Sequence, residues 1–150
     1  MISKRCVDLV KSFEGFSAKA YPDPATGAEP ITIGYGSTRY ADGSKVKMGD
    51  VVTNLEAQRL LLLDLERRYH AIKNWFPDDI RQNQIDAVVS FAYNCGIGAF
   101  EKSTLRKKIW ANPNDPDIRN EFMKWVRAGG KVMKGLQRRR KAESDLYFEA

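Results

Sequence analysis

The sequence predicts an α+β fold in which a small antiparallel β-sheet lobe and a larger helical lobe are joined by a long helix. The first observation is a run of short strand-like segments, interrupted by glycine and proline, between residues 18 and 48. The second is a long apolar helical pattern that follows a capping-box sequence at residues 53–56. The third is a series of shorter helical patterns that fills the rest of the chain.

These patterns place two lobes in one domain, residues 1–150. With 43% hydrophobic residues, a chain of 150 residues can bury a core of its own. We expect the β-rich lobe at about 15–55, and the helical lobe at about 56–150 together with a first helix over 3–14. The N-terminus lacks the continuous apolar run of a signal peptide, so we expect the protein to be made and kept in the cytoplasm.

Within the lobes, local signals set the order of the elements. Strands are expected in the runs KAYPD, ITIGYGST and KVKM, and Asp42-Gly43 is a hairpin signal before the last of them. The capping box Thr53 to Glu56 starts the long helix, which runs to about Trp75. Further helices follow, one capped by Ser103 or Thr104, and the last begins at about Leu136.

Glu14 is the first candidate catalytic residue. It ends a helix whose one face is apolar, with Ile2, Cys6, Leu9, Val10 and Phe13 at helical spacing. A carboxyl packed against such a face loses hydration, which disfavours its charged form. The position therefore suits a general acid.

Asp23 and Thr32 complete the candidate group. Asp23 lies between Pro22 and Pro24 in a turn with no apolar neighbours, so it should stay ionised. Two carboxyls in such different environments are typical of glycoside hydrolysis, where one protonates the leaving oxygen and the other handles a water molecule. Thr32, nine residues later, has a hydroxyl that can hold that water. By spacing alone, the same residues also fit an ordinary pair of solvated carboxylates.

The order of these residues resembles a known catalytic motif. A helix ending in Glu14, eight residues, Asp23, a short turn and then T-I-G-Y-G from Thr32 is similar to the motif of the phage-type muramidases. These are the endolysins of glycoside hydrolase family 24, which include the T4-like and lambdoid-phage lysozymes. The runs NQIDAVVSFAYNCGIGAFEKSTL and GGKVMKGLQRRRKAE are similar to later blocks of the family, so the resemblance covers nearly the whole chain.

The resemblance implies a lysozyme-like fold and hydrolysis of the β-1,4 bond between N-acetylmuramic acid and N-acetylglucosamine in peptidoglycan, which lyses the host cell. It implies that Glu14 is the general acid, that Asp23 positions or activates the water, that Thr32 helps to hold it, and that the anomeric centre is inverted. It further implies a monomer that waits in the host cytoplasm until a separate holin gives it access to the periplasm. The alternative enzyme, a lytic transglycosylase, needs the glutamate alone.

Three details of the motif stay open at this stage. The segment from Asp23 to Thr32 is longer by three residues than in the T4-like form, which makes Thr26 a rival for the role of Thr32. Gly34 and Gly36 are candidate substrate contacts because glycine admits a sugar close to the backbone, although glycine in a strand more often marks a bend or tight packing. Ser103 is a substrate contact by resemblance, and helix capping alone also explains it.

The positive charge of the chain is concentrated at its C-terminal end. Residues 1–100 carry 12 Lys and Arg against 12 Asp and Glu, whereas residues 101–150 carry 13 against 7, which gives the net charge of +6. Such a face attracts polyanions. We expect Arg138, Arg139, Arg140 and Lys141 to contact the anionic envelope, including lipopolysaccharide, and a solvated basic helix is the plain alternative.

The same positive charge also fits a hypothesis of another class, in which a cationic protein permeabilises the envelope through its C-terminal helix. Nucleic-acid binding is not expected, because the sequence has no groove-reading motif and no aromatic residues interleaved with the basic ones. Cys6 and Cys95 form neither a metal motif nor a disulfide framework, and His70 is the only histidine. We therefore expect buried thiols, no metal and no cofactor.

Overall fold

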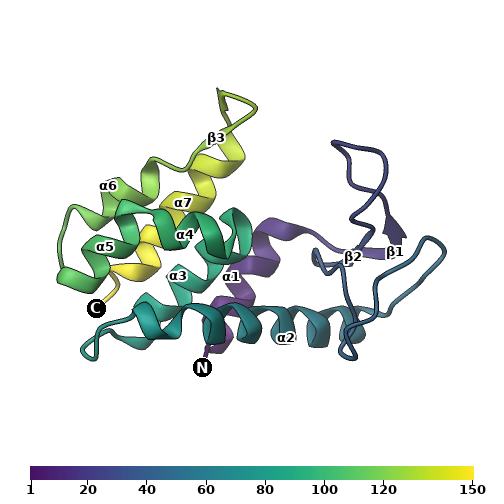
Figure 1. Cartoon of the computed structure of the whole chain (residues 1–150), viewed down its shortest axis with the longest axis horizontal. Helices are drawn as coiled ribbons and strands as arrows, with labels where there is room; N and C mark the ends of the chain where they lie inside the picture. Colours follow the sequence, from purple (N-terminus) through teal and green to yellow (C-terminus); the bar gives the residue numbers. More distant parts are fainter.

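The computed structural model describes all residues, Met1–Ala150. It confirms the predicted α+β fold: β1 and β2 lie at one end of the long helix α2, and α3 to α7 gather over its other end (Figure 1). In chain order the elements are α1 (Lys4–Glu14), β1 (Ser17–Tyr21), β2 (Thr32–Gly34), α2 (Asn54–Ile72), the short 3-10 helix η1 (Lys73–Trp75), α3 (Gln82–Cys95), α4 (Ile97–Lys102), α5 (Thr104–Ala111), α6 (Ile118–Met123), β3 (Arg127–Ala128), β4 (Lys131–Val132) and α7 (Lys134–Tyr147).

Helix α1 delivers Glu14 to the junction between the lobes. Its N-terminus is capped by the Ser3 hydroxyl, which accepts a hydrogen bond from the Arg5 amide. Cys6 and Val10 are fully buried on its inner face. The helix ends at Gly15, whose φ of 65° lies in the region that glycine adopts without steric cost.

The β-rich lobe is built on the antiparallel pair β1 and β2. In its register Tyr21 pairs with Thr32, and Ser17 pairs with Gly34 after an irregularity. The strand predicted at residues 45–48 is wrong, since this run makes only the single bridge between Arg39 and Lys45. The run instead follows a tight turn, and only its Val46 is buried.

Helix α2 begins with the predicted capping box. The Thr53 hydroxyl accepts from the Glu56 amide at 3.1 Å, and the Glu56 carboxylate accepts from the Thr53 amide at 3.2 Å. The face that it buries contains Ala57, Leu61 and Leu65, which lie four residues apart. This regular inner face lets one straight helix support both lobes.

Helix α3 is the centre of the helical lobe and packs against α1, α2, α4 and α7. Phe91 on this helix makes edge-on contacts with Phe100, Phe122 and Trp125, with ring centroids 5.4–6.2 Å apart. The cysteines Cys6 and Cys95 are free thiols, the first buried and the second partly so. None of the helices is both long enough and apolar enough to cross a membrane.

The expectation that residues 138–141 contact the anionic envelope is wrong for two of the four, and so is the alternative of a fully solvated basic helix. The whole residues Arg139 and Arg140 are only 3% and 0% exposed, whereas Arg138 and Lys141 are exposed. The reason is that α7 packs along α3, which forces one face of α7 into the core. The buried Glu143 compensates both guanidinium groups there.

Candidate active site

Glu14 lies at the end of α1 with two different neighbours for its two oxygens. Its Oε1 accepts a hydrogen bond of 2.5 Å from Nη1 of Arg139, and its side chain is 22% exposed. Its Oε2 lies 3.4 Å from the position that a Cβ would take on Gly36. The apolar surroundings expected from the sequence are therefore wrong, because a buried cation faces this carboxyl.

Arg139 is fixed from several sides. Its Nε lies 3.3 Å from Oε2 of Glu143, and its Nη2 donates to the backbone oxygen of Ser90 at 3.3 Å. The guanidinium also lies 5.9 Å from the centre of the Phe13 ring. Because its side chain is only 4% exposed, Arg139 holds Glu14 from within the core of the helical lobe.

Sequence reasoning missed Arg139 as a residue of the site and assigned it to the envelope. The signal was present in the four-residue spacing between Arg139 and Glu143, which makes an ion pair on one face of a helix. The spacing alone did not predict which face of α7 packs against α3.

Two tyrosines lie near the carboxyl of Glu14. The Tyr93 hydroxyl donates to the backbone oxygen of Tyr35 at 3.0 Å, and burial together with nearby negative charges, including Glu14, raises the pKa of Tyr93. Burial, with the charge of Glu14 in second place, also raises the pKa of Tyr21. Both phenols therefore stay neutral over the working range of a carboxyl group.

Of the two predicted glycines, Gly36 lies at the site, whereas Gly34 lies at the contact between β2 and α2. A Cβ on Gly36 would lie 3.0 Å from the Tyr93 hydroxyl, so Gly36 borders the group around Glu14. Gly34 is buried, and a Cβ there would lie 2.9 Å from Cβ of Ala57 on α2. The absence of a side chain at Gly34 thus serves the close contact between β2 and α2.

Asp23 and Thr32 lie on the β-rich side. Asp23 follows β1 in the turn, where its Oδ1 accepts from the Ala25 amide at 3.0 Å. Thr32 starts β2 opposite Tyr21, the tyrosine affected by the charge of Glu14, and its hydroxyl donates to the backbone oxygen of Pro30 at 3.3 Å. The register of β1 and β2 therefore places Thr32 beside Tyr21.

The rival threonine is used within the turn. The Thr26 hydroxyl donates to the backbone oxygen of Glu29 and accepts from the Ala28 amide, both at 3.2 Å, and the residue is exposed. These two bonds close the longer turn that separates Asp23 from Thr32. The three additional residues between Asp23 and Thr32 are therefore accommodated in this turn, before β2 begins.

The structure does not bring Ser103 to this site. The residue lies between α4 and α5, is only 4% exposed, and uses its hydroxyl to accept from the Arg106 amide and to donate to the Phe100 oxygen. Helix capping accounts for these contacts.

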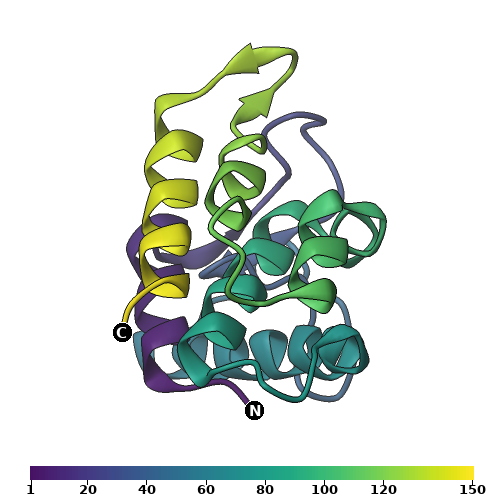
Figure 2. The same cartoon turned by 90° about the vertical axis from the view of Figure 1, so that its left-hand side faces the viewer.

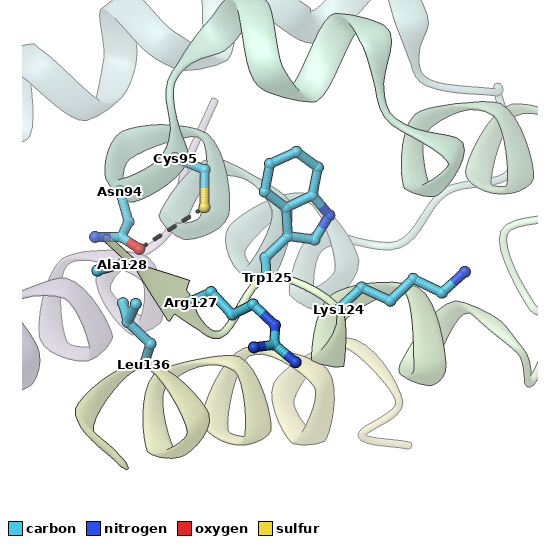
Figure 3. A pocket seen from close by; sticks show the side chains of 7 residues that line it. All are labelled: Asn94, Cys95, Lys124, Trp125, Arg127, Ala128 and Leu136. Atoms are coloured by element: carbon cyan, nitrogen blue, oxygen red, sulfur yellow. Dashed lines mark hydrogen bonds between the residues drawn. The ribbon is translucent and has the colours of Figure 1, made fainter. Parts of the chain in front are cut away.

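A pocket of about 540 Å³ opens beside Glu14. It lies between the end of α1 and the start of α7, and its lining includes Phe13, Met133, Arg138 and Arg139. A second pocket of about 470 Å³ shares Asn94, Ala128 and Leu136 with the first, so the two adjoin. Figure 3 shows the second pocket, whose other lining residues are Cys95, Lys124, Trp125 and Arg127.

The group around Glu14 provides an accessible carboxyl, a fixed cation beside it and neutral phenols. Asp23 provides a second carboxyl, on the turn after β1. Such groups support proton transfer and the handling of a water molecule. No three His, Cys, Asp or Glu side chains gather where they could hold a metal ion.

Comparisons with known proteins agree with the geometry. A family model described as phage lysozyme matches residues 11–143. The endolysin of Bacillus phage B103 is 40% identical over 147 residues, which cover 98% of this chain and 54% of that protein. The chain therefore spans about half the length of that relative, as it does for the endolysin of Bacillus phage PZA, which is 38% identical and 54% covered.

The similarity extends to solved structures. The endolysin from Escherichia coli O157:H7 phage FAHEc1 has 37% sequence identity and a TM-score of 0.87, with 99% of this chain and 94% of that chain covered. These matches confirm the lysozyme-like fold that the resemblance implied. The chain belongs to the phage lysozyme family.

Proposed function

We propose that the chain acts as a phage endolysin, a muramidase that hydrolyses the β-1,4 bond between N-acetylmuramic acid and N-acetylglucosamine in peptidoglycan. The observation that carries the proposal is the partly exposed Glu14, held by the buried Arg139 beside a pocket, in a chain of the phage lysozyme family. Cleavage of this polymer lyses the host cell. No cofactor is required by this chemistry.

In the proposed reaction Glu14 donates its proton to the glycosidic oxygen as the bond to the anomeric carbon breaks. The carboxylate that forms faces the guanidinium of Arg139, which stabilises the developing negative charge. Asp23 accepts a proton from the water that attacks the opposite face of the sugar, and Oδ2 of Asp23, which has no partner in the structure, is available for this. The first product then has the inverted, α configuration.

Thr32 is proposed to hold the attacking water, and Gly36 to admit the sugar next to Glu14. The geometry supports Thr32 over Thr26, because the hydroxyl of Thr26 both donates and accepts within its turn, whereas that of Thr32 only donates, to the Pro30 oxygen, and can still accept from a water molecule. It also supports Gly36 over Gly34, which packs against α2. Ser103 is left out because it is buried in its cap.

The experiment is the release of soluble fragments from purified sacculi. Glu14→Gln should lower the rate by at least about 100-fold, the usual contribution of a general acid, whereas the matched variant Glu29→Gln in the exposed turn should keep it. Asp23→Asn should lose most of the activity. Near-normal activity of Glu14→Gln, with its fold intact, would remove Glu14 from the role.

A second pair of variants separates the threonines. Thr32→Val should slow the release of fragments, and Thr26→Val should leave it close to normal after any loss of stability is allowed for. The opposite result would move the water-holding role to Thr26. The configuration of the first product, followed by NMR during the reaction, tests inversion: an initial β-anomer would contradict it.

We also propose the binding partner, the oligomeric state and the cellular location of the protein. The partner is bacterial peptidoglycan, and the chain acts as a monomer, which sedimentation of the purified protein tests. We place it in the host cytoplasm until a separate holin opens the way to the periplasm, so that expression without a holin should not lyse the cell. Because Arg139 and Arg140 are buried, we propose contact with lipopolysaccharide only for the exposed Arg138 and Lys141.

A further inference from the structure

The basic residues near the C-terminus separate into two groups in the structure. Residues 124–141 contain eight Lys and Arg and no Asp or Glu. Four of the eight have carboxylate partners: Lys124, Arg139, Arg140 and Lys141. The other four, Arg127, Lys131, Lys134 and Arg138, are exposed and make no ion pair.

The four free cations are all on the β3–β4 hairpin and the first turns of α7. We call the surface formed by residues 127–134 and Arg138 the hairpin face. The strands β3 and β4 have two residues each, all four of them exposed. Figure 2 shows that the hairpin projects beyond the ends of α6 and α7, away from the rest of the helical lobe.

The hairpin face also carries apolar side chains next to its cations. Val132 and Met133 are each 45% exposed and lie between Lys131 and Lys134 in the sequence. The helix α7 that follows has no acidic residue in its first turn. A projecting surface therefore combines uncompensated cations with uncovered apolar groups.

We propose that the hairpin face docks on the anionic surface of a phospholipid bilayer. The cations are attracted to anionic headgroups, and the side chains of Val132 and Met133 enter the apolar boundary beneath them. Peptidoglycan and nucleic acid also carry negative charge, but neither has an apolar phase to accept these two side chains. The inference goes beyond the proposed glycosidase activity and does not depend on it.

The test measures partition of the purified protein onto vesicles of phosphatidylglycerol and phosphatidylcholine. The variant Lys131→Gln/Lys134→Gln removes two cations that line neither pocket. Since each basic residue near such a surface contributes about fivefold in affinity, the double variant should bind about 30-fold more weakly. The control Lys45→Gln/Lys73→Gln removes two exposed cations outside the hairpin face and should change the affinity little.

A second pair of variants tests the apolar part. Val132→Thr keeps the shape of the side chain and should weaken binding by about three- to tenfold, in proportion to its exposed apolar surface. The matched control Val51→Thr changes an exposed valine in the β-rich lobe and should have no effect. About 1 M salt, where the Debye length is about 3 Å, should suppress the binding of the wild type.

Three results would overturn the proposal. One is equal loss of binding in the two lysine double variants, which would assign the attraction to net charge rather than to the hairpin face. Another is identical binding of Val132→Thr and the wild type, which would exclude entry of the apolar side chains. The third is that Lys131→Gln/Lys134→Gln weakens binding to lipid-free sacculi but not to vesicles, which would make the cell wall the partner.

Discussion

Glu143 connects the stability of the helical lobe to the candidate site, so replacing it by glutamine is an informative perturbation. The residue is fully buried in α7. Its Oε2 accepts a hydrogen bond of 2.6 Å from the Ser90 hydroxyl and lies 3.3 Å from Nε of Arg139, and its Oε1 lies 3.0 Å from Nε of Arg140. Glutamine keeps the shape of the side chain but removes the charge that compensates two buried guanidinium groups.

The magnitude follows from the burial of all three side chains, which are 0–4% exposed. Removing one partner of a buried ion pair costs about 3–5 kcal/mol, because the guanidinium of Arg140 then stays out of water with no carboxylate partner, whereas Arg139 keeps Glu14. A domain of this size has a free energy of unfolding of about 5–15 kcal/mol, so the loss is a large share of it. It corresponds to a decrease in Tm of about 6–20 °C.

Urea unfolding followed by circular dichroism measures this change. The control is Glu149→Gln, which removes the partner of Arg5 in an ion pair whose side chains are about half exposed and which should lose at most about 1 kcal/mol. If Glu143→Gln lost no more than this control, the argument that Glu143 compensates Arg139 and Arg140 would be refuted.

Two further predictions concern the β-rich lobe. Gly34→Ala should lose about 2–5 kcal/mol of unfolding free energy in urea, because φ is +66° and the new Cβ would lie 2.9 Å from that of Ala57. Gly27→Ala, at φ +70° with open space around it, should lose only about 1–2 kcal/mol, and equal losses would contradict the packing argument. Tyr40 donates a 2.6 Å hydrogen bond to Asp50, and burial together with this bond raises the pKa of Tyr40 to about 12. The folded protein therefore keeps a proton that the unfolded chain loses above about pH 10, so the stabilisation from this proton is present below pH 10 and lost between about 10 and 12. Tyr40→Phe should flatten this alkaline decrease in unfolding scans, and an unchanged pH profile would exclude Tyr40 as its cause.

Elements specified by local chemistry could be predicted from the sequence. The capping box at Thr53 and Glu56 starts α2 as expected, and Gly15 ends α1 so that Glu14 is its last residue. In both cases the deciding hydrogen bonds or dihedral angles involve residues within one helical turn. The strand expected at 45–48 failed because pairing in a sheet depends on a partner that the run itself does not specify.

The environment of the candidate site could not be predicted in the same way. The basic run at residues 138–141 predicts a solvated helix face. Instead, α7 packs along α3, so that Arg139 is buried and contacts Glu14, 125 residues away in the sequence. The apolar stripe of α1 was read correctly for Cys6 and Val10, but it does not specify what faces the end of the helix. Contacts of such sequence separation follow from the packing of the helices, which no local pattern contains.

The most direct test of the central proposal is mass spectrometry of the fragments released from purified peptidoglycan in water labelled with heavy oxygen. We predict that the wild type produces reducing muramic acid ends carrying one heavy oxygen from the water, and that Glu14→Gln releases such fragments at least about 100-fold more slowly. Anhydro-muramic ends without the label would contradict hydrolysis and indicate a lytic transglycosylase. Labelled ends released at the same rate by Glu14→Gln would contradict the role of Glu14.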